Sequence, residues 1–336
     1  MMKNSSRFLW LAIAALFALF IVSLSIGKFP VPLADILDAL GSGLTGGPQI
    51  DPMTSNIIWN VRLPRVVSGL CVGAALAAAG ATYQGLFRNP LVSPDILGVS
   101  AGASLGAVLG IYLSLPVATI QLLGFAGGLL AVAAVYAVGS GIRNRDPVLV
   151  LVLSGVAIGA LVGSGLSLIK ILADPYDQLP AITYWLLGSL TSVSNGDLLS
   201  VLPAFVVGLA PLVLLRWRIN LLTLGDEEAR SLGVDTRILR PLLIASATLI
   251  TAAAVSITGI IGWIGLIIPH MARLLVGPDF RKLLPMSMIL GAGYLLIVDI
   301  LARTIALIEI PLGILTAVVG APFFIWLLAS GRKGWQ

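Results

Sequence analysis

Long apolar runs recur along the whole chain and are separated by short polar connections. Most of the runs are continuous over about 18 to 25 residues, which is the length that a helix needs to cross a bilayer core of about 30 Å. They lack the alternation over about ten residues that is typical of transmembrane barrel strands. The pattern therefore predicts an all-α, polytopic membrane protein in which residues 1–336 form a single transmembrane domain.

The apolar runs predict ten spans. The first run follows Lys3 and Arg7, as the apolar region of a signal peptide does, but it is long for that role and no A-x-A site follows it. A retained first helix is therefore expected. The two spans within 241–276 are nearly continuous, and Ser256–Gly262 is the segment that offers a turn between them. The expected spans are 8–26, 63–83, 97–115, 118–140, 148–169, 193–215, 241–257, 260–276, 283–302 and 311–330.

Charge is distributed unevenly between the two sides of this topology. With the N-terminus in the cytoplasm, 15 of the 20 Lys and Arg residues fall inside and five fall outside. This bias predicts that both termini are cytoplasmic. It also accounts for the basic sequence pI of about 9.6 without a nucleic-acid partner. The five positive residues expected outside are Lys28, Arg62, Arg65, Lys170 and Arg303.

Candidate chemistry is sparse in a chain that is 58% hydrophobic. The single cysteine, Cys71, excludes an intrachain disulfide, and the single histidine, His270, excludes a His-based metal cluster. No phosphate-binding G-x-x-x-x-G-K-[ST] motif is present, so an ATP-driven process would need a partner chain. We expect no metal or cofactor on this chain.

An intramembrane serine protease is the enzymatic alternative. Residues 98–102 read GVSAG and match G-x-S-x-G, with Ser100 as nucleophile and His270 as base. The chain contains 37 glycines, which makes a chance match easy, and the strand–turn–helix context of such a nucleophile is missing. We therefore favour a chain that is not an enzyme, with His270 in a structural hydrogen bond.

Glycines recur every fourth residue in two of the expected spans, at 98–110 and 155–163. Small residues on one stripe let helix backbones approach closely, which matters where lipid gives no hydrophobic drive for association. We interpret both stripes as helix–helix packing within one subunit, with a pore-lining role as the alternative.

A charged segment, residues 216–240, interrupts the apolar pattern. Asp226, Glu227 and Glu228 favour the start of a short helix, where acids complement the helix dipole. Gly233 then fits a helix stop, and Asp235 fits the cap of a second short helix that begins at Thr236. On these grounds alone, the segment is either a capped solvated loop or a docking site for a soluble partner.

The segment LGDEEARSLGV (224–234) resembles the coupling helices of the FecCD/BtuC family of ABC importer permeases. Four more segments resemble further blocks of that family, in the same order. They are 62–104 (beginning RLPRVVSG), 185–190 (WLLGSL), 262–285 (GWIGLIIPHMARLLVGPDFRKLLP) and 299–328. The resemblance covers nearly the whole chain. It implies the type II ABC importer permease fold with ten spans, a homodimer with the pathway at its interface, two ATPase subunits that bind ATP–Mg, and a substrate-binding protein outside. It also favours the docking interpretation of the charged segment.

The resemblance implies roles for individual residues. Arg62, Arg65 and Arg303 would dock acidic residues of the binding protein, whereas position alone also allows them to reach lipid phosphates. The fifth span and 182–190 would line the pathway. The cytoplasmic gate would comprise Asn89, Leu91, Arg145 and Asp146, although the first two also fit a tight turn. The residues implied in coupling to the ATPase are Gly225, Asp226, Glu227, Glu228, Ala229, Arg230, Leu232 and Gly233.

Two acids lie near the outer half of the membrane. Asp299 and Arg303 are four residues apart, which predicts a salt bridge, and Glu309 is expected to end a turn.

The rival transport mechanism is an ion-coupled secondary carrier, because spans 2–5 and 7–10 have a weakly similar, inverted layout. The scarcity of acids in mid-span and the charged segment favour the ATP-driven importer. Its expected location is the cell inner membrane, and its cargo is a ferric siderophore, haem, cobalamin or an oxyanion such as molybdate.

Overall fold

The computed structural model describes residues 5–45, 51–142 and 147–329, and within these ranges every regular element is a helix. Seven helical stretches are long and apolar enough to cross a membrane, and three further apolar helices are shorter. Together they lie at the ten positions predicted from the apolar runs. The long ones are α1 (Ser5–Ser25), the stretch from α3 to α4 (Pro52–Leu86), α6 (Val117–Gly141), α7 (Pro147–Leu172), α9 (Asn195–Leu214), α12 (Thr236–Thr258) and α14 (Phe280–Thr304), and the shorter ones are α5 (Val99–Tyr112), α13 (Ile264–Val276) and α15 (Leu312–Ala329).

The second span is longer than predicted. The expected helix over 63–83 continues backwards through a π-helical turn, Ile57–Arg62, into α3 (Pro52–Asn56), and forwards to the end of α4 (Leu63–Leu86). A π turn inserts an extra residue into the helix and so changes the direction of the side chains that follow. Here the π turn ends at Arg62, three residues before Arg65.

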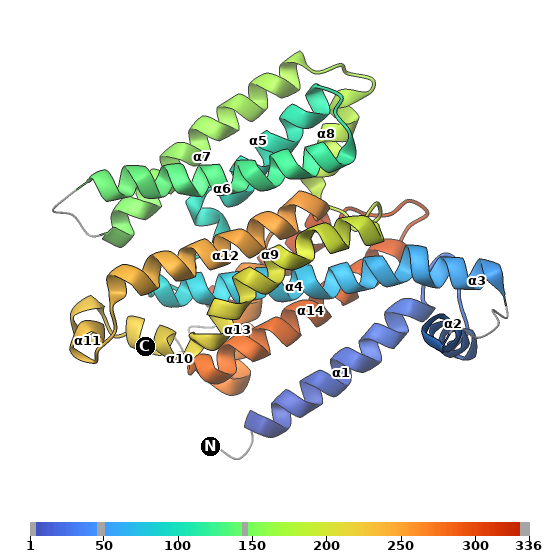
Figure 1. Ribbon diagram of the computed structural model, residues 1–336, viewed down its shortest axis with the longest axis horizontal. Coiled ribbons are helices and arrows are strands. Elements are labelled where there is room, and N and C mark those ends of the chain that lie inside the picture. The colour runs from blue at the N-terminus through green and yellow to red at the C-terminus, as the bar shows by residue number, and fades with distance from the viewer. Residues whose placement is uncertain (1–4, 46–50, 143–146, 330–336) are drawn as a thin grey trace.

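Helix α4 runs through the centre of the protein and packs against α14, α12 and α13 (Figure 1). Its contacts depend on glycine. A Cβ added at Gly73 would lie 2.3 Å from the carbonyl oxygen of Gly291, and one added at Gly80 would lie 2.0 Å from that of Gly265. Close backbone approach thus adds to the packing of buried apolar side chains in this core.

Helices α5, α6, α7 and α8 (Gln178–Leu187) form a second group above α12 in Figure 1. The first predicted glycine stripe packs as expected, because a Cβ at Gly106 would lie 2.0 Å from the carbonyl oxygen of Leu123 on α6. The second stripe behaves differently. Gly155 contacts the carbonyl oxygen of Ile96, but no described atom lies within 4 Å of a Cβ at Gly159 or Gly163. The prediction of packing within one subunit is therefore wrong for these two glycines.

The predicted turn between α12 and α13 is present at residues 259–263. Gly259 adopts φ +70°, and a Cβ there would lie 2.0 Å from the carbonyl oxygen of Trp185. A residue with a side chain would meet both a strained backbone and a clash at this position. The glycine therefore allows the chain to end one helix and begin the next beside α8.

The bundle has two distinct ends. The start of α1, α10 (Arg216–Leu222) and α11 (Asp226–Ser231) lie at one end, which we call the α11 end (Figure 1). Helices α2 (Leu33–Thr45) and α3 lie at the other, the α2 end. Helix α2 was not predicted. It buries Ile36 and Ala39 but leaves Leu33 and Leu37 more than half exposed.

Candidate functional site

Helix α11 begins and ends at glycines with positive φ. Gly225 has φ +134° before its first turn, and Gly233 has φ +82° after its last. Asp226, Glu227 and Glu228 occupy the first turn, where they complement the positive end of the helix dipole. The predicted stop at Gly233 is therefore present, and the backbone N–H of the next residue, Val234, donates to the carbonyl of Ala229 over 3.0 Å.

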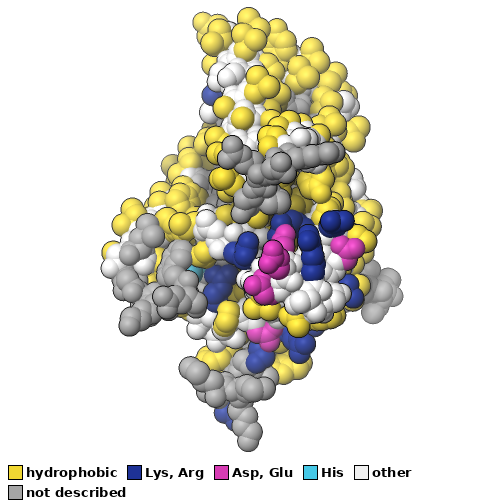
Figure 2. Space-filling view, turned by 90° about the vertical axis from the view of Figure 1, so that its left-hand side faces the viewer, with side chains coloured by type: hydrophobic (Ala, Val, Ile, Leu, Met, Phe, Trp, Pro, Cys, Tyr) yellow, Lys and Arg dark blue, Asp and Glu magenta, His cyan; other side chains and the backbone are white. Residues whose placement is uncertain are grey.

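Side-chain contacts fix α11 onto the start of α12. Asp226 forms a salt bridge of 2.6 Å with Arg240, and Arg230 donates from Nε to Thr236 over 3.1 Å. Ala229 is fully buried beneath the helix. Five predicted coupling residues remain exposed on this helix and at its end, namely Glu227, Glu228, Arg230, Leu232 and Gly233. Acidic and basic side chains gather on this face of the protein (Figure 2).

The prediction that a second, separate short helix begins at Thr236 is wrong. Asp235 does cap a helix there, accepting from the N–H of Arg237 over 2.9 Å, but that helix is α12 and it runs for 23 residues. Pro241 lies inside it without ending it, as is common in membrane helices whose neighbours satisfy the freed carbonyl. The short helices of the segment are therefore α10 and α11, and α11 connects directly to a spanning helix.

Part of the predicted cytoplasmic gate lies at the same end. Asn89 accepts a hydrogen bond from the N–H of Leu91 over 2.9 Å, which is the tight turn considered from the sequence, and Leu91 is 44% exposed. Arg88 before it adopts φ +50°. The other two predicted gate residues, Arg145 and Asp146, lie outside the described residues. The structure thus shows a turn at 88–91, and its role in gating stays a prediction.

A polar cavity of about 210 Å³ opens beside this turn and next to α10. It contains His270, which is only 6% exposed, together with Arg88 and Arg273. Gln84 on α4 connects this helix to α13. Its side chain accepts a hydrogen bond from Arg273 over 3.2 Å and donates one to the carbonyl of Leu266 over 3.1 Å. The buried position of His270 between α4 and α14 fits the structural role expected from the sequence. Ser100 of the protease alternative hydrogen-bonds Asp95 instead.

At the α2 end, two of the three predicted docking arginines bind the end of α1. Arg62 donates to the carbonyls of Leu24, Ser25 and Phe29, and Arg303 donates to the carbonyl of Ile26 over 2.9 Å. The last carbonyls of a helix have no partner within it, so these guanidinium groups supply the missing donors. Arg62 and Arg303 are 5% and 7% exposed, which makes binding of lipid phosphates a poor description of their role.

Arg65, the third of these arginines, lies in an ion-pair network. Its Nε is 2.8 Å from Asp299 and its Nη2 is 2.9 Å from Glu309. Asp299 is fully buried and also lies 3.0 Å from Nε of Arg303, so the predicted Asp299–Arg303 salt bridge is present. The structure brings all three arginines together at the α2 end. Their donors contact partners within the chain, and docking stays a prediction.

Glu309 was missed as a member of this network. It lies between α14 and α15 and accepts from Arg65 and, over 2.5 Å, from Thr191 in the segment after α8. Partial burial raises the pKa of Glu309, but the hydrogen bonds from Arg65 and Thr191 outweigh burial and hold the pKa below its ordinary value. Its position directly before Ile310 and Pro311 indicated only a turn, and nothing in the sequence pointed to Arg65, 244 residues away.

An apolar face along α7 has no partner in the described chain. Leu161 and Ile171 are 73% and 80% exposed, and Gly159 and Gly163 open onto empty space. This helix is the predicted fifth span, which the family resemblance implies as a lining of the substrate pathway. A soluble protein rarely leaves such a face uncovered, so it is a candidate for contact with lipid, with cargo or with a second subunit.

Comparisons with known proteins agree with this architecture. The sequence profile described as "FecCD transport family" matches residues 15–330. The chain is 46% identical over 278 residues to the "Probable iron chelatin transport system permease protein" of Helicobacter pylori, covering 83% of this chain and 84% of the relative. It is 40% identical over 318 residues to the "Molybdate import system permease protein MolB" of Haemophilus influenzae, covering 94% and 93%. A solved structure described as an inward-facing conformation of a metal-chelate type ABC transporter superposes with a TM-score of 0.87 at 37% identity, covering 97% of this chain and 99% of that one.

Proposed function

Because this chain belongs to the FecCD transport family, we propose that it is the permease subunit of a binding-protein-dependent ABC importer for a metal chelate. The observation that carries the proposal is α11, an exposed acidic helix fixed by the Asp226–Arg240 salt bridge to the start of a spanning helix. A partner ATPase that moves α11 would move α12 with it. ATP–Mg would bind to two such ATPase subunits, since this chain lacks a phosphate-binding loop.

The working unit in this proposal is a homodimer with the substrate pathway between its subunits. The uncovered face of α7 supports it, because Gly159 and Gly163 leave room for the close approach of a second helix or of cargo. The pathway would also include α8 and the residues up to Leu190, and the gate at its cytoplasmic end would include Asn89 and Leu91. Cargo would cross by alternating access as the ATPases bind and hydrolyse ATP.

A ferric siderophore is the first candidate cargo, in line with the iron chelatin named for the Helicobacter pylori relative. Haem, cobalamin and molybdate are the other candidates, and molybdate is named for the Haemophilus influenzae relative. The face of α7 is mainly apolar and glycine-rich, and its charged residue, Lys170, lies in the last turn of the helix, so the binding protein would be the main determinant of the cargo.

Reconstitution in proteoliposomes tests the importer mechanism. We expect uptake of an iron-loaded siderophore when the chain is combined with its ATPase, its binding protein and ATP. The permease alone in an ion gradient should transport nothing, whereas an ion-coupled secondary carrier would work alone. Charge reversal of Glu227 and Glu228 should abolish uptake while the dimer stays assembled. Uptake by the permease alone would overturn the proposal.

The proposed orientation places the α11 end in the cytoplasm of an inner-membrane protein, with both termini on that side. Cysteine labelling with an impermeant reagent in spheroplasts tests it in a Cys71→Ala background. Tyr176→Cys, which replaces a residue 92% exposed after α7, should be labelled from outside. Gly334→Cys should be labelled only after the membrane is permeabilised. The reverse result would invert the topology predicted by the charge bias.

A further inference from the structure

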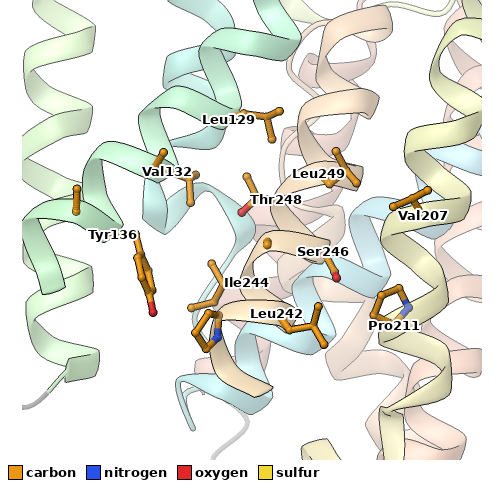
Figure 3. Close-up of a pocket in the computed structure, with 14 residues that line it drawn as sticks. Leu129, Val132, Tyr136, Val207, Pro211, Leu242, Ile244, Ser246, Thr248 and Leu249 are labelled. Carbon is orange, nitrogen blue, oxygen red and sulfur yellow. The ribbon is translucent and has the colours of Figure 1, made fainter. Parts of the chain in front are cut away.

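A long apolar groove of about 650 Å³ runs between α6, α9 and α12. Figure 3 shows Leu129, Val132 and Tyr136 of α6 on one side, and Val207 and Pro211 of α9 on the other. Its polar lining is restricted to Tyr136, Ser246 and Thr248, and the Thr248 hydroxyl already contacts Tyr83 over 3.0 Å. The groove therefore offers an apolar ligand contact area but few hydrogen bonds.

The groove has a length close to that of one membrane leaflet. Its lining on α12 extends from Pro241 to Leu249, which corresponds to about 12 Å along a helix. It begins five residues after the start of α12 at Thr236, so it lies near the α11 end of the bundle. Half of a hydrocarbon core of about 30 Å is about 15 Å. An acyl chain of the leaflet at the α11 end would thus fit along the groove.

Two exposed arginines, one on α12 and one on α10, lie toward the α11 end, where the groove begins. Arg237 is exposed and lies four residues before Pro241, hence one turn nearer the helix start on the same face of α12. Arg218 is exposed directly after α9, where its guanidinium stacks over Trp217 at 5.3 Å. Among the residues that the structure describes, neither arginine has a carboxylate within salt-bridge distance. Tryptophan and arginine at this depth are typical of the membrane–water interface.

We propose that this groove is a binding site for one anionic phospholipid of the leaflet at the α11 end. An acyl chain would lie between α6 and α9, and the phosphate would accept hydrogen bonds from Arg237 and Arg218, whose geometry suits phosphate oxygens. Basic pockets between spanning helices on the cytoplasmic side are typical anionic headgroup sites. The lipid would contact α12 within one turn of Arg240, the residue that holds α11. The inference is independent of the cargo and of the ATPase.

Native mass spectrometry of the full chain in detergent, titrated with phosphatidylglycerol or phosphatidylcholine of identical acyl chains, tests headgroup recognition. We expect the wild type to prefer phosphatidylglycerol. Arg237→Gln should weaken phosphatidylglycerol binding about fivefold, which corresponds to the contribution of one basic residue near an anionic surface. Arg281→Gln serves as the control, because Arg281 is exposed at the start of α14, which does not line the groove. Equal affinity of the wild type for both lipids would overturn the proposal.

A second pair of variants tests the acyl-chain site. Ala245 is an exposed residue of the groove lining, so Ala245→Trp should fill the groove and lower the number of tightly retained phospholipids by one. Ala210→Trp on α9 is the matched control, because Ala210 is exposed but does not line the groove. Unchanged lipid retention by Ala245→Trp would contradict the proposal. Loss of a dimer mass with lipid retention intact would assign the groove to a second copy of the chain instead, and would contradict it as well.

Discussion

Asp299 holds two arginines at once, since its carboxylate lies 2.8 Å from Nε of Arg65 on α4 and 3.0 Å from Nε of Arg303 one turn further along α14. The carboxylate is fully buried, and both guanidinium groups are more than nine-tenths buried. Burial of charges is costly unless each one is paired, so the three side chains depend on one another. Through Arg303 and Arg62, the same cluster holds the end of α1.

We predict that Asp299→Asn destabilises the protein strongly. The substitution leaves two arginines buried with one fewer negative charge, and removal of one partner from a buried pair costs about 3–5 kcal/mol. Thermal unfolding in detergent, followed by a fluorescence probe, would measure the loss. Asp174→Asn, which changes an exposed acid between α7 and α8, is the control and should leave the unfolding temperature unchanged. Equal unfolding temperatures for the two variants would show that the network is not needed for stability.

The Glu309–Arg65 pair should make stability depend on pH in a defined direction. The pKa of Glu309 in the folded protein lies below its ordinary value of 4.5, so the unfolded chain binds its proton more readily than the folded one does. This contribution to stability is complete above pH 4.5 and is lost as the pH falls through the lower, folded pKa. The gap in unfolding temperature between wild type and Glu309→Gln should therefore be present at neutral pH and disappear on acidification. A gap that persists or widens in acid would contradict the assignment.

Residue patterns predicted the helices well, because a membrane span shows its own length and polarity in the sequence. The turn at 259–263 could be predicted from its glycines for the same local reason. The boundaries were less accurate. The span from 241 was started where the apolar run begins, whereas the helix begins five residues earlier at its Asp235 cap. Helix α2, with Asp35 and Asp38 among its apolar residues, has no span-like run and was missed.

Long-range partners were harder to predict than helices. The Asp299–Arg303 pair could be predicted because both residues lie on one helix face. Arg65 and Glu309 lie 244 residues apart, and nothing local in the sequence shows that they meet. The glycine stripe on α7 illustrates the same limit, because its spacing indicates close approach but not the identity of the neighbour. The sequence thus specifies which surfaces need partners, and the fold specifies which of them are satisfied within the chain.

Helix α11 should be sensitive to its backbone at one position. The N–H of Ala229 donates to the carbonyl of Gly225 over 3.0 Å, and Ala229 is fully buried against the rest of the segment. Proline there removes the donor and costs a helix about 3 kcal/mol, whereas glycine costs about 1 kcal/mol. We expect Ala229→Pro to abolish the stimulation of partner ATP hydrolysis by cargo-loaded binding protein, and Ala229→Gly to reduce it partly. Normal stimulation in Ala229→Pro would show that α11 is not the coupling element.

Docking of a binding protein to Arg62, Arg65 and Arg303 can be tested through Glu309. Substitution of these arginines by acids would disrupt buried contacts and confuse folding with binding. Glu309→Gln instead removes the more exposed of the two carboxylates that bind Arg65, while Asp299 continues to hold the guanidinium in place. If the arginine cluster docks acidic residues, the additional net positive charge should speed association of the binding protein at low salt, and the effect should fade as salt screens the charges. Association kinetics in nanodiscs across a salt series would measure this, with Asp174→Asn as a control that removes one negative charge elsewhere at the α2 end. An equal change in both variants, or none in Glu309→Gln, would mean that the three arginines hold α1 and the loop before α15 and take no part in docking.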